Sequence, residues 1–484
     1  MPSRSSISAS RSACEASVAS SIDVRSTCPA EVRAPSALWT RLAPDPLAPD
    51  GLGGMPGRTV AVDWEVAEDE RFDRVAARGT VDAVPEAAHS VHVEVAALAP
   101  GREYFYRFRA AGALSPVGRT RTAPEPGSLG ALTTCVASCA NYPVGWFTAY
   151  RRLAEDEPEL VLHLGDYLYE YSTPAGSVRA VVGPETTELA GYRQRHAQYR
   201  TDPDLQAAHA VAPWLVVWDD HEVDNNWAGE TAEDGSRLLA RRAAAFQAYY
   251  EHMPLRRSSV PRGIDMQLYR RVPWGALATF HMMDTRQYRS DQACGDRMRV
   301  DCGERFDPAR SLPGAAQEAW LLDGLRTSRA RWDVLGQQVF FAERRGRDGA
   351  YAMDAWDGYA PSRDRVTRGW VEAGVRNAVV LTGDVHTHWA NELPLDDTVV
   401  GTELVAGSVT SEGDGDGATD HPDLHVNPHL RFRSNRRGYV RVRYSADRVT
   451  ADFRVLDAVT RPGEPVRTAA SFVIPDREPG LNPA

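Results

Sequence analysis

Apolar and polar residues alternate in short runs between residues 37 and 122, with turn-forming residues between the runs. The alternation is clearest at residues 59–66 and 89–95. A period of two predicts β-strands that bury one face, and several short strands of this kind predict a β-sandwich. Residues 103–108 form an aromatic strand, and a tyrosine in it is suited to the corner role of immunoglobulin-like sandwiches.

Beyond Gly130 the pattern changes to buried apolar runs separated by amphipathic stretches. This change predicts an α/β layered domain rather than a second sandwich. Apolar residues recur at intervals of three and four in the helices that we expect at 147–155, 236–253 and 315–329. A chain of 484 residues also exceeds what one hydrophobic core supports. We expect an atypical leader at 1–36, disordered or wrongly assigned to the chain, an all-β domain at 37–125 and an α/β domain at 128–476.

Four apolar runs in the second domain end abruptly in residues that bind metals or transfer protons. In an open α/β sheet the ligand crevice lies beyond the carboxyl ends of the strands, so residues at these ends should converge. Positions that are distant in the sequence can therefore form one site. The runs span residues 132–139, 160–169, 214–222 and 378–388.

The ends of these runs carry carboxylates and histidines in close succession. Asp166 follows a glycine that permits a tight turn, and its carboxylate is placed to bridge two cations. Residues 219–222 include three carboxylates, which repel one another unless solvent or cations relieve them. Asp384, His386 and His388 are spaced by two, so an extended segment would present all three on one side. Together these features predict a metal site.

Each motif also has an ordinary structural explanation. Asp166 alone is typical of a turn or helix cap, and residues 219–222 or 384–388 alone are typical of surface loops. Cys139 is, by residue type, more often a small buried hydrophobe than a ligand, and Tyr169 more often a packing aromatic. The recurrence at several run ends is what favours chemistry.

Composition narrows the class of function. The net charge of −11 and the pI near 5.7 argue against a general nucleic-acid-binding protein, which carries a basic face. No apolar run approaches the length of a membrane span, and residues 1–36 lack the apolar stretch of a secretory signal. Cys294 and Cys302 lie eight positions apart and either form a disulfide or remain free thiols.

Several segments match the motifs of a known family. At these residues the sequence resembles the alkaline phosphatase D (PhoD-like) family, a branch of the calcineurin-like metallophosphoesterases. The likeness covers about residues 37–476. The segments are ASCANYP around Cys139, LHLGDYLYEY around Asp166, WDDHEVDNNW around Asp220, DTRQYR from Asp284, AWDGY from Ala355, LTGDVHTHW around Asp384, GSVTSEG from Gly407, and, near the amino terminus, LWTRLAP from Leu38 and PGREYFYRFRA from Pro100.

The resemblance implies a fold and a metal centre. The fold is an α/β (α+β layered) β-sandwich flanked by helices, preceded by an immunoglobulin-like or fibronectin III-like domain. The metals are iron(III) and calcium. Carried over by motif, Cys139, Asp166 and Tyr169 would bind iron, and thiolate and phenolate are good donors to it. Asp220 and Asp384 would hold calcium, which prefers oxygen donors.

Further residues receive roles from the same motifs. His386 would complete the iron site or a bridging site. His221, next to Asp220, is placed to protonate the leaving group, although it could also only orient a neighbour by a hydrogen bond. His388, Asn225 and Asn141 are weaker candidates for supporting the ligands or for contacting substrate.

The predicted activity is the hydrolysis of phosphate esters by a metal-bound hydroxide, with Asp166 and His221 as the catalytic residues. One alternative is a phospholipase D-like diesterase that acts on lipids or cell-wall teichoic acid. A second alternative is a noncatalytic surface-binding protein. The presence of His221 beside a full ligand set counts against that last alternative.

Partners and location follow from the resemblance. Small-molecule or polymeric phosphate esters are the expected partners, without a nucleic-acid-binding module or a transmembrane segment, and a monomer is expected. Relatives carry a twin-arginine export signal, which implies a secreted, periplasmic or cell-surface protein. Residues 1–36 show no such signal.

Overall fold

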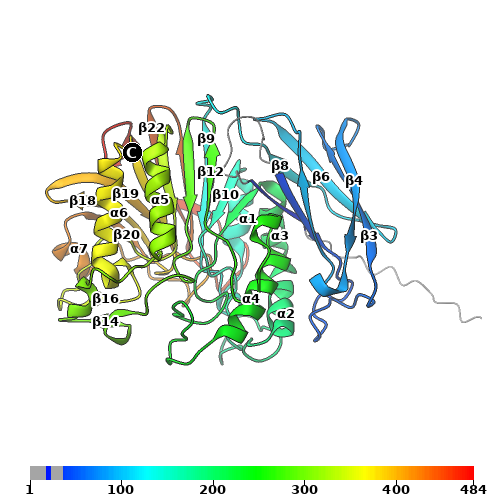
Figure 1. Cartoon of the computed structure of the whole chain (residues 1–484), viewed down its shortest axis with the longest axis horizontal. Helices are drawn as coiled ribbons and strands as arrows, with labels where there is room; N and C mark the ends of the chain where they lie inside the picture. Colours follow the sequence, from blue (N-terminus) through cyan, green and yellow to red (C-terminus); the bar gives the residue numbers. More distant parts are fainter. Residues whose placement is uncertain (1–17, 23–35) are drawn as a thin grey trace, which may run out of the picture.

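The computed structural model describes residues 18–22 and 36–484, which form an all-β domain followed by a larger α/β domain (Figure 1). The first domain consists of two sheets packed face to face. One sheet has the order β1-β2-β5, and the other has the order β4-β3-β6-β7, with β8 also paired to β6. The strands are β1 Val18–Ile22, β2 Ser36–Arg41, β3 Val60–Ala67, β4 Val75–Ala83, β5 Ser90–Val95, β6 Glu103–Ala110, β7 Ala113–Leu114 and β8 Gly118–Arg121.

Alternation explains this sandwich, as the sequence predicts. On β6, Tyr104, Tyr106 and Phe108 are buried, while the residues between them are more exposed. They share one apolar core with Leu38 of β2 and Val93 of β5. The Tyr104 hydroxyl accepts a hydrogen bond from the backbone N–H of Ala99 at 2.9 Å, which confirms the predicted tyrosine corner.

The α/β domain is built on two mixed sheets. The first has the order β11-β10-β9-β21-β22-β23-β24, and the second has the order β12-β13-β15-β17-β19-β18-β20. In each, parallel strands lie next to antiparallel ones. The bounds are β9 Leu132–Ala137, β10 Leu160–His163, β11 Trp214–Val216, β12 Arg270–Trp274, β13 Ala278–Met282, β15 Trp332–Gly336, β17 Ala378–Thr382, β18 His388–Leu395, β19 Thr398–Val405, β20 Leu430–Ser434, β21 Gly438–Tyr444, β22 Arg448–Leu456, β23 Val466–Pro475 and β24 Asn482–Pro483. A separate two-stranded antiparallel sheet consists of β14 Met298–Arg299 and β16 Tyr351–Ala352.

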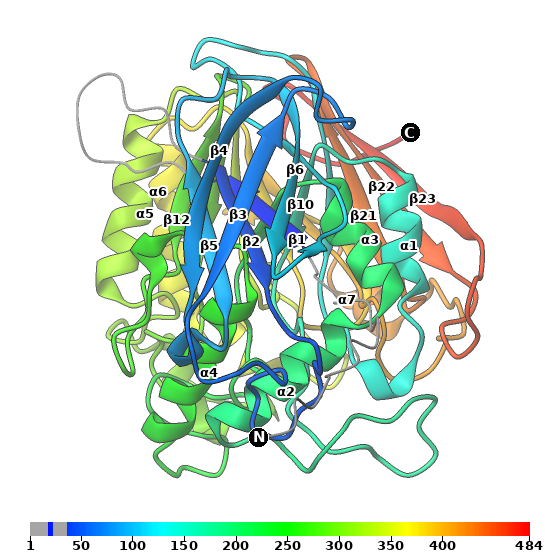
Figure 2. The ribbon, with the colours of Figure 1, turned by 90° about the vertical axis from the view of Figure 1, so that its right-hand side faces the viewer.

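Helices cover the outer faces of the two sheets, so the layers follow the predicted order of a helix-flanked sandwich (Figures 1 and 2). Helices α5 and α6 bury Leu321 and Trp370 against the second sheet. Helices α1 and α3 bury Tyr150 and Leu205 against the first sheet. The helices are α1 Thr148–Glu155, α2 Leu189–Arg200, α3 Pro203–Val211, α4 Leu239–His252, α5 Ala315–Thr327, α6 Ala360–Glu372 and α7 Pro422–Val426. Three of them match the predicted helices within a few residues.

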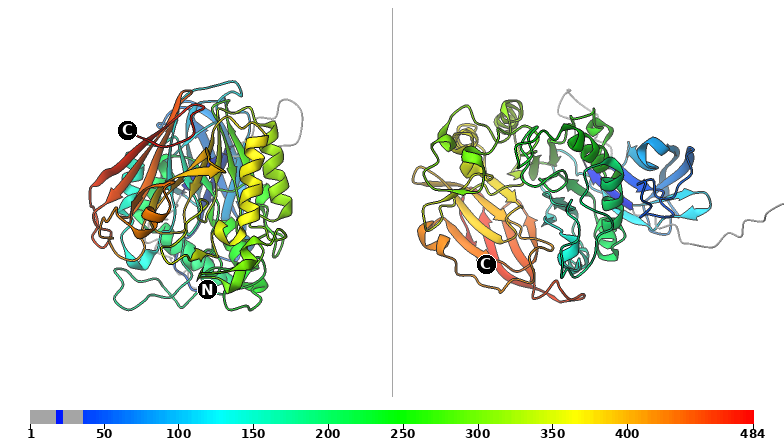
Figure 3. Two further views of the ribbon diagram at one scale, coloured as in Figure 1. Left: turned by 90° about the vertical axis from the view of Figure 1, so that its left-hand side faces the viewer. Right: turned by 90° about the horizontal axis from the view of Figure 1, so that it is seen from below.

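The two domains meet along β2 and β5 on one side and α2 and α4 on the other (Figure 3). The indole N–H of Trp39 donates to the carbonyl of Glu251 at 2.9 Å. His92 bonds to the carbonyl of Met253 at 2.9 Å, and its ring stacks on Tyr250 with a centroid distance of 4.4 Å. These contacts fix the sandwich against the helical side of the larger domain.

The amino-terminal segment differs in one respect from the predicted disordered leader. Within the leader predicted to be disordered, Val18–Ile22 forms a strand that pairs antiparallel with β2. The rest of residues 1–35 lies outside the described residues. Near the carboxyl end, β23 pairs with β22 at the edge of the first sheet. Cys294 and Cys302 form a disulfide, which settles the alternative left open by their spacing.

Candidate active site

The candidate site lies where four parallel strands end. Loops that follow β9, β10, β11 and β17 carry all of the predicted metal ligands. Four of these ligands adopt left-handed backbone conformations that non-glycine residues rarely adopt. The φ angles are 57° at Cys139, 53° at Asp166, 64° at Asp384 and 53° at His386. Such strain persists where the surrounding structure enforces it, and it is frequent at active sites.

Two glycines allow these loops to approach one another. A Cβ atom on Gly165 would lie 2.4 Å from Cβ of Asp219, and one on Gly383 would lie 2.8 Å from Cβ of Ser138. Any side chain at either position would therefore push the loops after β10 and β11, or after β17 and β9, apart. The glycines that precede Asp166 and Asp384 thus set the compactness of the site.

The loops bring acidic, sulfur and imidazole groups within ligand distance of one another. In each of three groups, one potential ligand atom per residue lies within 4.8 Å of the others. Asp166 and Asp220 each belong to two groups, so the three form one continuous cluster. The groups are Cys139, Asp166 and His386; Asp166, Asp220 and His221; and Asp219, Asp220 and Asp384.

Tyr169 joins the first of these groups. Its hydroxyl donates to Oδ2 of Asp166 at 3.1 Å and lies 2.9 Å from Nε2 of His386. The phenol oxygen is therefore directed at the space that Cys139, Asp166 and His386 share. This position matches the one predicted from the LHLGDYLYEY motif.

The cluster is short of positive charge. Burial and neighbouring carboxylates raise the pKa of Asp166 and of Asp384 well above the ordinary value. The same causes raise the pKa of Asp219 to about 7. The pKa of Asp220 is instead lowered, because Arg286 and His221 outweigh the effect of burial. A carboxylate cluster of this kind is stabilised by bound cations.

Unsatisfied oxygens show where cations fit. Oδ2 of Asp219 and Oδ1 of Asp220 are buried without a hydrogen-bond partner among the described residues. Among the residues that the structure describes, Asp384 has only Arg286 within ion-pair range, with Nη2 of Arg286 4.0 Å from its Oδ1. Buried oxygens normally have hydrogen-bond partners, so the two unpartnered oxygens of Asp219 and Asp220 are free to coordinate a metal. The donors present, a thiol and a phenol at one side and carboxylates at the other, fit a metal centre with two kinds of ion.

His221 is held beside the cluster by a carboxylate. Its Nδ1 lies 2.8 Å from Oε2 of the buried Glu170, and its ring stacks on Tyr169 at 4.0 Å between centroids. Burial lowers the pKa of His221, but the charges of Glu170, Asp220 and Asp166 raise it above the ordinary value overall. The histidine is thus oriented by Glu170, and the surrounding carboxylates favour its protonated form.

Two residues to which the sequence assigned no role, Arg286 and Glu222, complete the site. Fully buried Arg286 donates from Nε to Oδ1 of Asp219 at 2.5 Å and from Nη1 to Oδ1 of Asp354 at 2.9 Å. Glu222 accepts the backbone N–H of Asp166 at 3.0 Å and of Asp219 at 2.8 Å, so it ties two loops together. Arg286 lies within the family motif DTRQYR, which could have identified it as a site residue. The sequence presented Glu222 as one more carboxylate that could bind metal, not as a residue that joins two loops.

The weaker candidates lie around the cluster. Asn225 binds Oε1 of Glu170 through its backbone N–H at 3.0 Å and borders a hollow of about 790 Å³. Tyr171 also lines this hollow, and its ring meets that of His221 edge-on with a centroid distance of 5.4 Å. The backbone N–H of Asn141 bonds to the carbonyl of Thr410 at 3.1 Å, within the GSVTSEG segment. Neither residue belongs to the three groups of potential ligands.

The predicted alignment of Asp384, His386 and His388 is wrong. The chain turns at Asp384 and His386, where φ is positive, so the segment is not extended. His388 begins β18, is fully buried, and accepts the N–H of Gly407 at its Nδ1 at 2.9 Å. Its contact with the site is indirect, through Gly407, whose carbonyl accepts a hydrogen bond from Ser138.

Comparisons with known proteins identify the family of this chain. The model of the PhoD-like phosphatase family matches residues 134–453, and that of the PhoD-like phosphatase N-terminal domain matches residues 31–124. Alkaline phosphatase D of Bacillus subtilis (strain 168) is 48% identical over 463 residues, which cover 92% of this chain and 79% of the relative. These matches do not favour the alternative of a lipid-directed diesterase or of a noncatalytic binding protein.

Solved structures give the same picture. The structure of PhoD superposes with a TM-score of 0.91 and 46% identity, covering 97% of this chain and 91% of that one. A purple acid phosphatase from yellow lupin seeds has a TM-score of 0.62 at 11% identity over 96% of this chain and 74% of that one, which extends the likeness in fold alone. The match of the family model over most of the chain and the identity to alkaline phosphatase D show that this protein belongs to the PhoD-like phosphatase family.

Proposed function

We propose that this PhoD-like phosphatase hydrolyses phosphate esters at a centre that holds iron(III) and calcium. The observation that carries the proposal is the convergence of Cys139, Asp166 and His386 with two further carboxylate groups at the ends of four strands. A structural role explains the cluster poorly, because Oδ2 of Asp219 and Oδ1 of Asp220 are buried without a hydrogen-bond partner among the described residues.

The iron ligands in this proposal are Cys139, Asp166, Tyr169 and His386. Thiolate, phenolate, carboxylate and imidazole together form a donor set suited to a trivalent iron. The contacts of the Tyr169 hydroxyl with both Asp166 and His386 support a shared ion among them. The buried thiol of Cys139, whose pKa is raised by burial, would bind as thiolate only with a cation beside it.

The calcium ligands are Asp220 and Asp384, with Asp166 between the two kinds of ion. Calcium prefers oxygen donors, and this side of the cluster offers only carboxylates and one histidine. Arg286 pairs with one oxygen of Asp219 and leaves the other unpartnered among the described residues. Asp219 is therefore a further candidate for the calcium side.

The bound ions would supply Lewis-acid activation of water and neutralisation of the phosphoryl oxygens. Side chains of the protein would donate the proton to the leaving group and position the substrate. His221, with Nδ1 on Glu170, has Nε2 left to donate a proton to the departing alkoxide. Arg286 places a fixed positive charge beside Asp220 and Asp384, where a phosphoryl group would sit. The hollow beside Asn225 would accept the rest of the ester.

The location proposed for the protein is outside the cytoplasm. The disulfide of Cys294 and Cys302 supports this, because disulfides persist in oxidising compartments. None of the described helices is both long and apolar enough to cross a membrane. That the protein is a monomer stays a prediction.

A metal-depletion experiment tests the function. Purified protein is dialysed against a chelator and assayed with a mono-aryl and a bis-aryl phosphate before and after iron and calcium are returned. We expect activity to disappear on depletion and to return only when both metals are present. Full activity in the depleted protein, or restoration by zinc alone, would refute the proposed centre. The ratio of the two rates separates monoesterase from diesterase preference.

A further inference from the structure

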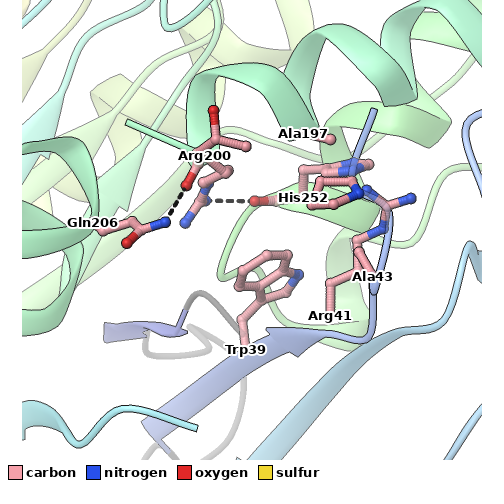
Figure 4. Close-up of a pocket in the computed structure, with 9 residues that line it drawn as sticks. Trp39, Arg41, Ala43, Ala197, Arg200, Gln206 and His252 are labelled. Carbon is pink, nitrogen blue, oxygen red and sulfur yellow. Dashed lines mark hydrogen bonds between the residues drawn. The ribbon is translucent and has the colours of Figure 1, made fainter. Parts of the chain in front are cut away.

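A small cavity lies at the junction of the two domains, apart from the active site. Its walls come from β2 of the sandwich and from α2 and α4 of the larger domain (Figure 4). Its volume is about 30 Å³, enough for a water molecule or a small ion. The residues that line it are Trp39, Arg41, Ala43, Pro46, Ala197, Arg200, Thr201, Gln206 and His252.

The charge on these walls is positive. Glu251 and Asp50 act on Arg41 from outside the lining, whereas the main charges on Arg200 include no carboxylate. Arg41 and Arg200 are 4% and 5% exposed, and no aspartate or glutamate is among the described residues that line the cavity. The nearby Glu251 is held by Arg193, with Nε and Nη2 of Arg193 2.7 and 2.6 Å from its two oxygens. Buried cations without a counter-charge are costly, so the cavity favours an anion.

Arg200 has hydrogen-bond donors to spare. Its Nη2 donates to the carbonyl of His252 at 2.5 Å, and its guanidinium stacks on Trp39 at 4.6 Å from the ring centroid. Its Nε and Nη1 are buried without a partner among the described residues. Guanidinium groups form strong charge-assisted hydrogen bonds with anions, and two such donors are available here.

The same positive charge acts on two neighbouring histidines. His196 and His252 stack on each other with ring centroids 5.0 Å apart. Burial lowers the pKa of both, and Arg41 and Arg200 lower it further. Water in the cavity would satisfy the free N–H groups of Arg200 but would leave its charge without an anionic partner.

We propose that this cavity binds a small inorganic anion on the guanidinium of Arg200 in the larger domain, beside Arg41 of the sandwich, whose Nε and Nη2 already donate to the carbonyls of Ala88 and Gly51. The anion would serve to join the two domains, and it does not depend on the chemistry of the active site. Chloride is small enough for the cavity. Orthophosphate is a larger candidate that would also accept hydrogen bonds from the guanidinium group.

Bromide provides a structural test. Crystals of the full chain grown without halide are soaked in sodium bromide, and anomalous scattering locates the ion. We expect a bromide peak in the cavity within hydrogen-bonding distance of Nε or Nη1 of Arg200. Density for water alone, with no anomalous peak there, would overturn the proposal.

A stability measurement tests the site in solution. The thermal midpoint of the full chain is followed as sodium chloride replaces sodium gluconate at constant ionic strength, and a parallel series uses sodium phosphate. We expect a saturable rise of about 1–3 °C for the anion that the site holds. The series that produces the rise distinguishes chloride from phosphate. Equal midpoints in all three salts would contradict a resident anion.

Variants show whether the rise comes from this cavity. Arg200→Gln should abolish it, and Arg41→Gln serves in its place if the first variant does not fold. Arg305→Gln is the matched control, because Arg305 is equally buried, donates to the carbonyl of Asp357 at 2.9 Å and lies outside the cavity lining. The control should keep the full rise. A rise that persists in Arg200→Gln would place the anion elsewhere and refute the proposal.

Discussion

Two carboxylates of the α/β domain differ in how their oxygens are satisfied: Glu403 is fully buried, and the side chain of Asp384 is 24% exposed. Glu403, within β19, accepts hydrogen bonds from the N–H groups of Phe341 and Ala342 and from the side chains of Thr382 and Asn391, at 2.6 to 3.0 Å. Asp384, two residues beyond the neighbouring strand β17, has only the distant Arg286 at 4.0 Å. The first carboxylate is complete within the protein, and the second lacks partners.

The backbone shows the same difference. Glu403 pairs in register with Val380 and Asn391 in a regular sheet. Asp384 and Asp166 follow glycines in tight turns with positive φ. Hydrogen-bond satisfaction and backbone strain therefore separate a structural carboxylate from a ligand better than burial does. The following predictions test this distinction.

The largest effect is expected from Asp166→Asn. An amide cannot bridge two cations, so kcat/KM for an aryl phosphate should fall about 10³-fold or more. The thermal midpoint of the metal-free protein should not fall, because the substitution removes a crowded negative charge. Glu403→Gln is the control and should keep its activity per folded molecule. Near-normal turnover by the Asp166 variant would mean that Asp166 is not a ligand.

His221→Asn should have the next largest effect. Loss of the proton donor should lower kcat about 10²-fold for esters with a poor leaving group and much less for nitrophenyl esters, which leave without a proton. Glu170→Gln should reproduce part of this pattern, because Glu170 orients Nδ1. An equal loss for good and poor leaving groups would instead indicate a purely orienting role.

Much of the fold could be predicted from the sequence because its elements are set by local periodicity. The alternation at 59–66 and 89–95 and the three amphipathic helices depend on burial along one face, which the sequence shows directly. The pairing of residues 18–22 with β2 could not be predicted, because it depends on a long-range contact and has no alternation of its own.

The site was only partly predictable for a related reason. Residues that follow strands, such as Asp166 and Asp220, carry a local signal of apolar residues followed by acids. Arg286 does not, since it reaches Asp219 and Asp354 from a different loop. The error at His388 arose from assuming an extended backbone where the φ values of Asp384 and His386 impose turns.

Glu403→Gln should chiefly affect stability. The amide cannot accept hydrogen bonds at both ends, so the free energy of unfolding should fall by about 2 kcal/mol. Denaturant unfolding of the metal-free protein measures this, so that lost metal binding does not enter the comparison. An Asp384→Asn variant at least as destabilised as the Glu403 variant would remove the distinction between the two environments.

The smallest effect concerns pH and the domain junction. Burial lowers the pKa of His92 to about 4, despite its bonds to the carbonyls of Met253 and Tyr250 and the nearby Glu94, with Arg257 adding to the decrease. A lowered folded-state pKa means that the stability is complete above about pH 6.5 and is lost as pH falls toward 4. The thermal midpoint of wild type should fall more than that of His92→Gln between pH 7 and pH 5. Parallel pH profiles would show that His92 does not contribute.

The central claim is that Cys139, Asp166, Tyr169 and His386 gather around iron. Elemental analysis together with visible absorption of the purified protein, compared with Tyr169→Phe, tests it most directly. The account predicts iron-loaded, coloured wild-type protein with a charge-transfer band that is lost or shifted in the variant while iron remains bound. A colourless, iron-free wild-type protein that hydrolyses phosphate esters at its full rate would contradict the account.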